Sequence, residues 1–230
     1  MHPTAVATAG SSVIQGGVSY GVEEPEFPRL DTSPFRPYAV NVISGKNVQV
    51  TAGTVRNVYV KANSNPTFTG GTVEGVVYIE TPNKVTFDSN QSIRGVIVVQ
   101  NDPTGDPSTN QLIFRSNTGI YGVETLPATK DFPAALREMT GSIILAPTFG
   151  VHFSSNFGVA GGCVVADEVN FDSNSVGTIA GTVIALGGGG VRMAPNTNIT
   201  VDASRSATPA GMTFTAGYRP IASTYDEAKD

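Results

Sequence analysis

The stretch KVTFDSNQSIRGVIVV, residues 84–99, and the stretch EVNFDSNSVGTIAGTVIAL, residues 168–186, both contain the tetrapeptide FDSN, and this repetition decides the fold. A pattern that returns at a regular spacing is the sequence signature of a repeat architecture. Aligned on FDSN, the chain contains further copies in which a large apolar residue takes the phenylalanine position. These anchor residues are Val50, Phe68, Phe87, Phe114, Phe153, Phe171 and Met193.

Three residues after each anchor stands either glycine or asparagine. The members of this column are Gly53, Gly71, Asn90, Asn117, Asn156, Asn174 and Asn196. Glycine and asparagine are the residues that most easily take left-handed backbone angles, so the column predicts a ladder of corners with positive φ. A second column precedes the β-branched runs and predicts a second corner, at Asn57, Gly75, Gly95, Gly122, Gly161 and Gly181.

The spacing of the anchors selects one repeat architecture. Phe68 and Phe87 are 19 residues apart, and Phe153 and Phe171 are 18 residues apart. This period is too short for a propeller blade, and the leucine spacing of leucine-rich repeats is absent. We therefore predict an all-β fold, a single-stranded parallel β-helix of about seven to nine coils, right-handed because parallel crossovers almost always are.

Alternation along each strand predicts which side chains face the core. The anchors point inward, so Phe68, Phe87, Phe114, Phe153 and Phe171 are expected to stack as a core ladder. The residue after each anchor points outward. Asp88 and Arg115 take this outward position on neighbouring coils, which predicts an ion pair between them.

We expect residues 1–230 to form a single β-helix domain with two insertions. Residues 101–110, NDPTGDPSTN, are rich in turn signals and predict a surface loop. Residues 127–141 predict one short inserted helix, because Pro133 suits its first turn and Gly141 its end.

The segments outside the repeats are also expected to be irregular. Residues 21–41 carry Pro25, Pro28, Pro34 and Pro37, a density that predicts an extended segment with neither helix nor central strand. Residues 216–230 predict a frayed tail.

Composition excludes several classes of partner. Charged residues make up 14% of the chain, the net charge is −5, and no basic cluster is present, so nucleic acid is not an expected partner. No stretch approaches the roughly 20 apolar residues of a membrane span. The start of the chain also lacks the basic and apolar regions of a signal peptide.

The chain offers little catalytic chemistry, and we expect no catalytic residue, cofactor or metal site. Of the two histidines, His2 is at the chain start and His152 points outward beside an anchor. Cys163 aligns with the core positions Val77, Ile97 and Val183, which predicts a buried thiol. The glycine run 187–190 has no following Lys and Ser/Thr of a phosphate-binding loop, so it predicts either a wide corner or a close backbone approach between coils.

Three features of the chain are shared with a known group of proteins. They are the motif Phe-x-Ser/Gly-Asn/Gly, the motif Gly-Val-x-Val, and the stretch EEPEFPRLDTSPFRPYAV at residues 23–40. From Pro25 to Ala203 the chain resembles the β-helical, surface-exposed part of bacterial cell-envelope proteins that accompany type IV or Tad-type pilus assembly. The resemblance implies an extracellular or cell-envelope module, a fragment of a membrane-anchored protein, with other envelope or pilus proteins or surface glycans as partners. It carries no catalytic residues.

Three functions therefore remain open from the sequence. The first is a non-catalytic structural or adhesion module that displays its insertions, because loops on a rigid scaffold often carry recognition. A carbohydrate-binding or carbohydrate-active β-helix, such as a polysaccharide lyase or hydrolase, is the second. The third is a self-assembling scaffold like the bactofilins, which share the glycine and valine rhythm but are more compact and uninterrupted.

Overall fold

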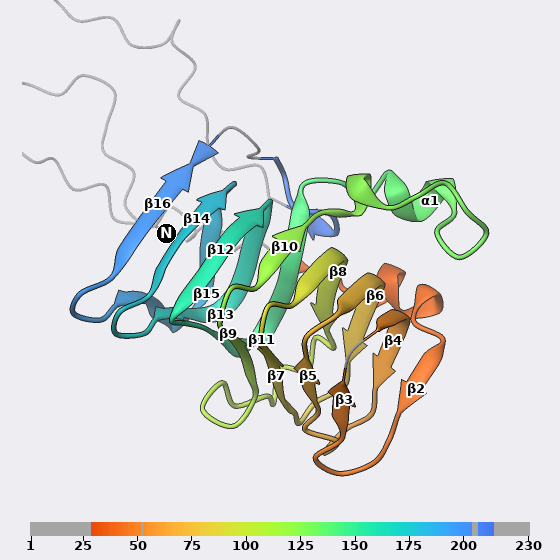
Figure 1. Ribbon diagram of the computed structural model, residues 1–230, viewed down its shortest axis with the longest axis horizontal. Helices are drawn as coiled ribbons and strands as arrows, with labels where there is room; N and C mark the ends of the chain where they lie inside the picture. The colour runs from red at the N-terminus through yellow and green to blue at the C-terminus, as the bar shows by residue number, and fades with distance from the viewer. Residues whose placement is uncertain (1–28, 52, 204–206, 214–230) are drawn as a thin grey trace, which may run out of the picture. The chain divides into compact units, whose positions relative to one another are not determined.

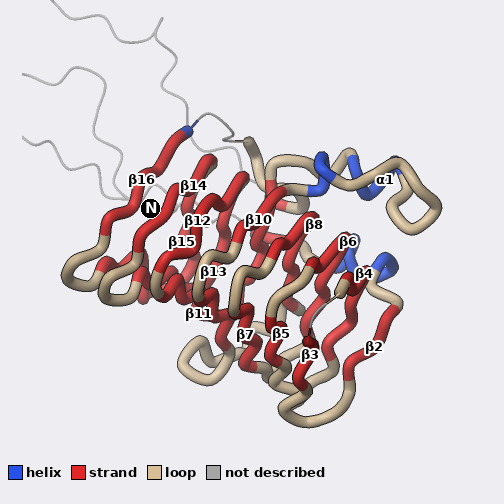
Figure 2. The backbone as a smooth tube through the Cα atoms, viewed as in Figure 1, coloured by secondary structure: helices blue, strands red, loops and turns tan. Residues whose placement is uncertain are grey.

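Each repeat forms one coil with three faces, and each face is a parallel sheet (Figures 1 and 2). The computed structural model describes residues 29–51, 53–203 and 207–213. Within these residues each face contains seven strands, so the prediction of a parallel β-helix is confirmed. Its right-handedness stays a prediction.

Face A carries the anchor residues. It consists of β3 (Gln49–Thr51), β5 (Thr67–Thr69), β7 (Lys84–Asp88), β9 (Gln111–Arg115) and the C-terminal parts of β11 (Ser142–Ser154), β13 (Cys163–Phe171) and β15 (Val183–Met193).

Face B follows each asparagine or glycine corner. It consists of the N-terminal parts of β4 (Thr54–Val60), β6 (Thr72–Ile79) and β8 (Ser92–Val99), followed by β10 (Gly119–Tyr121), β12 (Asn156–Gly161), β14 (Val176–Ala180) and β16 (Asn198–Asp202).

Face C closes the coil. It consists of β2 (Asn41–Ile43), the C-terminal parts of β4, β6 and β8, and the N-terminal parts of β11, β13 and β15. The strands β4, β6 and β8 each bend from face B to face C without a break in the assigned strand.

The anchor residues form one continuous register in face A. Val50 pairs with Phe68, and the pairing continues through the phenylalanines to Met193. The four successive ring pairs from Phe68 to Phe171 have centroid separations of 5.0, 5.1, 5.2 and 5.4 Å, and all four are stacked. Phe157 of face B, which the sequence pattern did not single out, adds a further ring 4.6 Å from Phe153. Each such pair contributes about 0.5–1.5 kcal/mol beyond the burial of its area.

The corner ladder agrees with the sequence at six of its seven positions. Positive φ angles occur at Gly53, Gly71, Asn90, Asn117, Asn174 and Asn196. The prediction is wrong at Asn156, which begins β12, while Ser155 (φ 70°) and Gly158 (φ 72°) take left-handed angles on either side. The reason is a register shift between Asn156 and Gly158, across which the Asn156 Oδ1 accepts a hydrogen bond from the Gly158 N–H at 3.1 Å.

The second corner agrees less well with its sequence column. Asn57, Gly75 and Gly95 have positive φ, but Gly122 has φ −68° and precedes the 3-10 helix η2 (Val123–Thr125). The insertion separates Gly122 from the following face C strand, and Gly141 takes the left-handed angle instead. In the next coil Gly162, not Gly161, is left-handed. Coils are close here: a Cβ on Gly95 would lie 1.9 Å from the Gly75 carbonyl oxygen.

Face C is buried on both sides, unlike faces A and B. Its outer side carries a second apolar cluster that includes Tyr59, Val98 and Leu145, and this cluster is separate from the core inside the coils. The covering residues come from the 3-10 helix η1 (Ser33–Tyr38), from the segment 122–141 that includes the residue 127–141 insertion, and from the antiparallel pair β1 (Arg29–Leu30) with β17 (Met212–Thr213). Prolines 25 and 28 lie outside the described residues.

The prediction that residues 21–41 are extended without helix is wrong for residues 33–38, which form η1. Pro34 lies in the first turn, where no backbone N–H is needed, and its fixed φ suits a 3-10 turn. Burial of Phe35, 1% exposed, holds this short helix on face C.

The two insertions leave the stack at different corners. Residues 101–110 form a loop between faces C and A and project at the lower edge of Figure 1. Residues 127–141 contain α1 (Ala134–Arg137), the short helix that the sequence predicts. The predicted tail at residues 216–230, like residues 1–28 and 214–215, lies outside the described residues.

The ion pair predicted between Asp88 and Arg115 is wrong. No ion pair joins them in the described part of the chain, where the Oδ1 of Asp88 accepts a hydrogen bond from the Ser89 N–H at 2.7 Å. This bond turns the carboxylate toward the corner that begins at Ser89, and the ordered pairing of β7 with β9 ends at Phe87 and Phe114.

Candidate functional site

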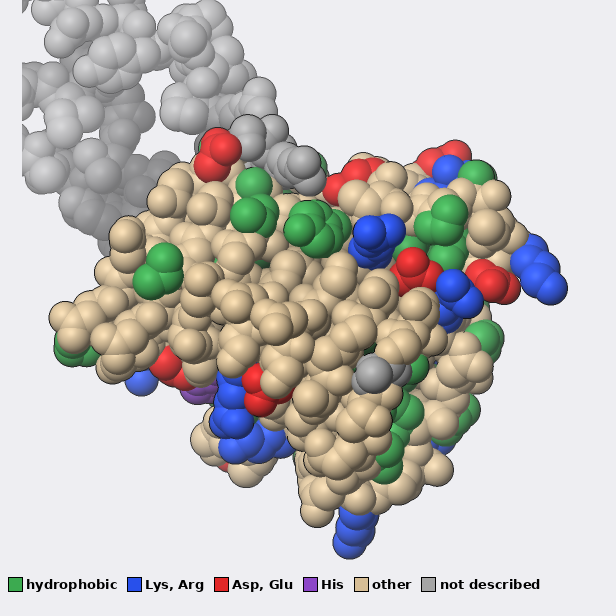
Figure 3. Space-filling view, in the orientation of Figure 1, with side chains coloured by type: hydrophobic (Ala, Val, Ile, Leu, Met, Phe, Trp, Pro, Cys, Tyr) green, Lys and Arg blue, Asp and Glu red, His purple; other side chains and the backbone are tan. Residues whose placement is uncertain are grey.

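A polar groove on face A is the best candidate for a binding site. It has a volume of about 550 Å³ and lies between the first coils and the residue 101–110 loop. In Figure 3 the notch at the lower edge, beside the projecting loop, marks its position. The groove is lined by Asn47, Asn65, Thr67, Lys84, Thr86, Ser108, Thr109 and Gln111.

The floor of the groove consists of outward-facing side chains on neighbouring strands of face A, arranged in two rows that cross those strands. Thr67 of β5 pairs in register with Thr86 of β7, and Lys84 of β7 pairs with Gln111 of β9. Neighbouring strands of a sheet lie about 4.8 Å apart, so these side chains repeat at that interval along the groove. The alternation that buries Phe68 and Phe87 is what exposes the threonines.

An asparagine ladder fixes the corner at one side of the floor. The Asn65 N–H donates to the Asn83 Oδ1 at 2.9 Å, and the Asn83 N–H donates to the Asn110 Oδ1 at 3.0 Å. The Lys84 N–H donates to the Asn65 Oδ1 at 2.8 Å. Asn83 and Asn110 are each 1% exposed, so the corner beneath the groove is fully packed.

The wall of the groove is held by side chains that bond within their own loop. The Asp102 Oδ1 accepts from the Thr104 N–H at 3.0 Å, and the Asp106 Oδ1 accepts from the Ser108 N–H at 2.8 Å. Hydrogen bonds from Thr104 and from Ser108 lower the pKa of Asp102 and of Asp106, respectively. The Thr148 hydroxyl also donates to the Gln100 carbonyl at 3.1 Å, which ties the start of the loop to β11.

Lys84 is the one charged residue among those that line the groove. Its side chain makes no ion pair within the described part of the chain. All other lining side chains are amides or hydroxyls, which both donate and accept hydrogen bonds. The groove can therefore bind a ligand rich in hydroxyl groups and can attract one negative charge.

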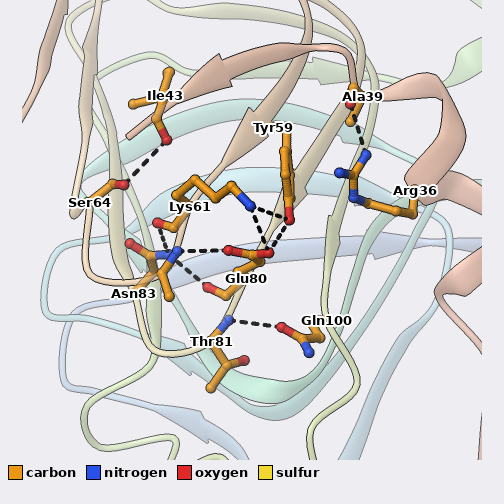
Figure 4. Close-up of polar contacts among 11 residues, drawn as sticks. Arg36, Ala39, Ile43, Tyr59, Lys61, Ser64, Glu80, Thr81, Asn83 and Gln100 are labelled. Carbon is orange, nitrogen blue, oxygen red and sulfur yellow. Dashed lines mark hydrogen bonds and ion pairs between the residues drawn. The ribbon is translucent and has the colours of Figure 1, made fainter. Parts of the chain in front are cut away.

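A second polar cluster lies on the outer side of face C (Figure 4). The Tyr59 hydroxyl donates to the Glu80 carboxylate, and the Lys61 Nζ lies 3.2 Å from the same hydroxyl. Burial acts to raise the pKa of Glu80, but the bonds from Tyr59 and Ala62 and the Lys61 charge together lower it. The Arg36 guanidinium lies 3.6 Å from the centre of the Tyr59 ring. Because Arg36 belongs to η1, this cluster attaches η1 to the coils.

His152 points outward, as its sequence position predicts, and lies near two polar side chains. Its Nδ1 is 3.5 Å from the Asp172 Oδ1, and the Ser154 hydroxyl donates to the Asp172 carboxylate. The carboxylate therefore lies between serine and histidine, whereas a nucleophilic triad needs the histidine to accept from the serine. The order of these three groups therefore differs from that of a Ser-His-Asp triad.

Cys163 is buried, but its predicted position is wrong by one residue. Val164, not Cys163, pairs with Val183 and aligns through Ile144 with Ile97 and Val77. Cys163 pairs instead with Ser142, because the register shifts at the start of β11, and its Sγ lies 3.1 Å from the Ala207 carbonyl oxygen. His2 lies outside the described residues.

The glycine run 187–190 allows close approach of two carboxylates in the preceding coil. A Cβ on Gly187 would lie 2.4 Å from the Asp167 carboxylate oxygens, and a Cβ on Gly189 would lie 2.3 Å from the Glu168 Oε2. Burial first, and then the charge of Glu168, raises the pKa of Asp167. Close approach therefore occurs at Gly187 and Gly189, where glycine lies over two acidic side chains, while Gly190 takes a left-handed corner angle (φ 65°).

Sequence reasoning missed the groove because its lining residues are individually ordinary. The available signal was the coincidence of outward threonines in TFT and VTF with an insertion at the next corner of the same face. Among the described residues, no group of three or more His, Cys, Asp and Glu side chains is placed to hold a metal ion. Likewise, the described part of the chain contains no helix with the length and hydrophobicity to cross a membrane.

Comparisons of the chain with protein families, with curated proteins and with solved structures find no match.

Proposed function

We propose that this chain is a non-catalytic extracellular module that provides structure or adhesion at a bacterial surface or on a pilus. The observation that carries the proposal is the polar groove, whose rigid floor is sheet and whose rigid wall is the residue 101–110 loop. Recognition sites commonly consist of loops held by such a scaffold. The partner is a surface glycan or another envelope protein.

The outer chemistry of the coils supports recognition better than catalysis. On the face that Figure 3 shows, backbone and neutral side chains cover most of the surface, and acidic and basic groups occupy a smaller part of it. Neutral hydroxyl and amide groups bind by hydrogen bonding but are weak acids and bases at neutral pH. A surface of this kind suits an adhesion module.

A glycan array and an assay for new reducing ends, both on the purified protein, test the proposal. Binding without bond cleavage is the expected result. Cleavage of any bound glycan would overturn the non-catalytic assignment. Failure to bind any glycan or any envelope protein from the same surface would overturn the adhesion assignment.

A carbohydrate-active enzyme is a second candidate, and Asp167 is the observation in its favour. A raised pKa beside a second carboxylate is what a general acid in glycoside hydrolysis needs. If this candidate is correct, Asp167→Asn abolishes the release of reducing ends and leaves glycan binding intact.

Self-assembly is a third candidate, favoured by the exposed end of the anchor ladder. Met193, in the last described strand of face A, is 58% exposed although Phe171, with which it pairs in register, is buried. A second copy stacked on this rung would bury it. A sedimentation coefficient that rises with protein concentration would favour this candidate over a monomeric adhesin, provided that Met193→Lys removes the concentration dependence.

A further inference from the structure

We propose that the groove on face A binds an acidic polysaccharide, with Lys84 holding a carboxylate or sulfate and the threonine row holding sugar hydroxyls. This inference rests on the proposed adhesion function and specifies its ligand. The groove volume of about 550 Å³ lies within the usual range for sites that enclose small ligands or short stretches of a polymer.

The floor matches a hydroxyl-rich ligand because its side chains can reverse their hydrogen-bonding roles. The hydroxyls of Thr67 and Thr86 each donate one bond and accept others. Gln111 is held by the wall, since its Nε2 donates to the Ser108 carbonyl at 3.1 Å, which leaves its amide oxygen as an acceptor. Side chains that both donate and accept on neighbouring strands complement a chain of sugars, whose hydroxyls also play both roles.

The charge of the groove selects an anionic chain. The whole protein has a net charge of −5, yet among the described residues that line the groove the only charged one is the cation Lys84. The nearby carboxylates of Asp102 and Asp106 bond to backbone N–H groups of their own loop, so neither is the ion-pair partner of Lys84. A single ammonium acts as a point charge and suits a carboxylate or sulfate on a sugar ring.

Other classes of macromolecule fit the groove less well. Single-stranded nucleic acid needs aromatic side chains on which bases stack and a row of cations along the backbone, and the lining residues provide neither. The centre of a protein interface needs a buried aromatic or apolar anchor, and the lining residues of the groove include none. A polysaccharide requires only the hydrogen bonds and the charge that are present.

The wall is in place before a ligand binds, so the groove is pre-organised. Ser108 and Thr109 face the floor from a loop fixed by its own hydrogen bonds, and the Asn110 that follows is buried in the asparagine ladder. Little conformational entropy is then lost when a ligand binds. The residue 101–110 insertion, which interrupts the repeat, therefore also forms the wall of the proposed site.

Calorimetric titration of the full chain with oligogalacturonate, and with the same oligomer methyl-esterified, tests the inference. The two probes differ in charge and share the sugar backbone. We expect the acidic oligomer to bind at least ten times more tightly than its ester, and we expect high salt to reduce that difference. Lys84→Met should weaken binding of the acidic oligomer about tenfold and leave binding of the ester unchanged, because it removes the charge and keeps the aliphatic stem.

Lys130→Met, at an exposed site in the other insertion, is the matched control and should leave both affinities unchanged. Thr86→Val keeps a β-branched residue in the strand and removes one hydroxyl, so it should weaken both oligomers by a similar factor. If acid and ester bind equally well, and Lys84→Met changes neither affinity, the acidic ligand is wrong but the proposed adhesion function still stands. Absence of binding by either oligomer would overturn the acidic ligand, and the adhesion function would fall as well if neither the glycan array nor any envelope protein from the same surface gave binding.

Discussion

Phe87 and Phe114 are 27 residues apart in the sequence, yet their rings stack with centroids 5.1 Å apart and planes 6° apart. The residue 101–110 loop leaves the coil at the corner before β9, so the extra residues do not change the register of face A. A β-helix can therefore accept a binding loop at a corner without loss of its core. This separation of core from corner is the physical basis of the proposed site.

Phe114→Ala should lower the free energy of unfolding by about 3–5 kcal/mol, because it opens a cavity between the two neighbouring rings. Both neighbours, Phe87 and Phe153, lose a stacking partner. Urea denaturation followed by circular dichroism measures the change. Tyr121→Ala is the control, since Tyr121 is 38% exposed on face B, and its effect should be well below 1.5 kcal/mol. Equal losses for both variants would contradict the ladder as a source of stability.

The corner ladder gives a matched pair of substitutions. Asn174→Val should cost about 1–2 kcal/mol, because φ at Asn174 is 63° and a β-branched residue is strained in the left-handed region. Asn156→Val should cost much less, since Asn156 lies in β12 without a positive φ. Thermal denaturation of the two variants measures the difference, and a melting temperature that falls more for Asn156→Val would sink the corner assignment.

The asparagine ladder under the groove gives a third prediction. Asn83→Ala removes the side-chain amide that donates to the carbonyls of Glu80 at 2.7 Å and Lys61 at 2.9 Å. It also removes the acceptor of the Asn65 N–H. Unpaired buried groups cost about 1–3 kcal/mol each, so the loss of stability should exceed that of an ordinary surface change. Hydrogen exchange should speed up at Asn65 and stay unchanged in the distant strand β14; uniform exchange throughout would contradict a local role.

The sequence could predict the coils because their corners and anchors repeat. It could not predict the features that occur in one coil and not in the others. Phe68 and Asn90 recur in type from coil to coil, so alignment alone identifies their places. Asn156 and Cys163 were misplaced because local register shifts move a residue by one position, and no composition signal marks such a shift. The groove was missed because it joins strands to a loop from a different turn, a relationship that exists only in three dimensions.

Asp167→Asn should raise the melting temperature at pH 7. Burial and the charge of Glu168 raise the pKa of Asp167 in the folded protein, so the folded state keeps a proton over a pH range in which the unfolded chain has lost it. Stability from this proton is fully present below the ordinary pKa of 3.8 and is lost as the pH rises through the raised pKa of the folded state. Asparagine stays neutral at every pH, so its advantage over aspartate should shrink toward zero below pH 3.8.

Asp106→Asn should have the opposite effect and lower the melting temperature at pH 7. Hydrogen bonds from Ser108 lower the pKa of Asp106, so its charged form is the one that stabilises the fold. Calorimetric melting curves across this pH range measure both variants, and a gain for Asp167→Asn that grows in acid would contradict a half-buried, destabilised carboxylate beside the glycine run.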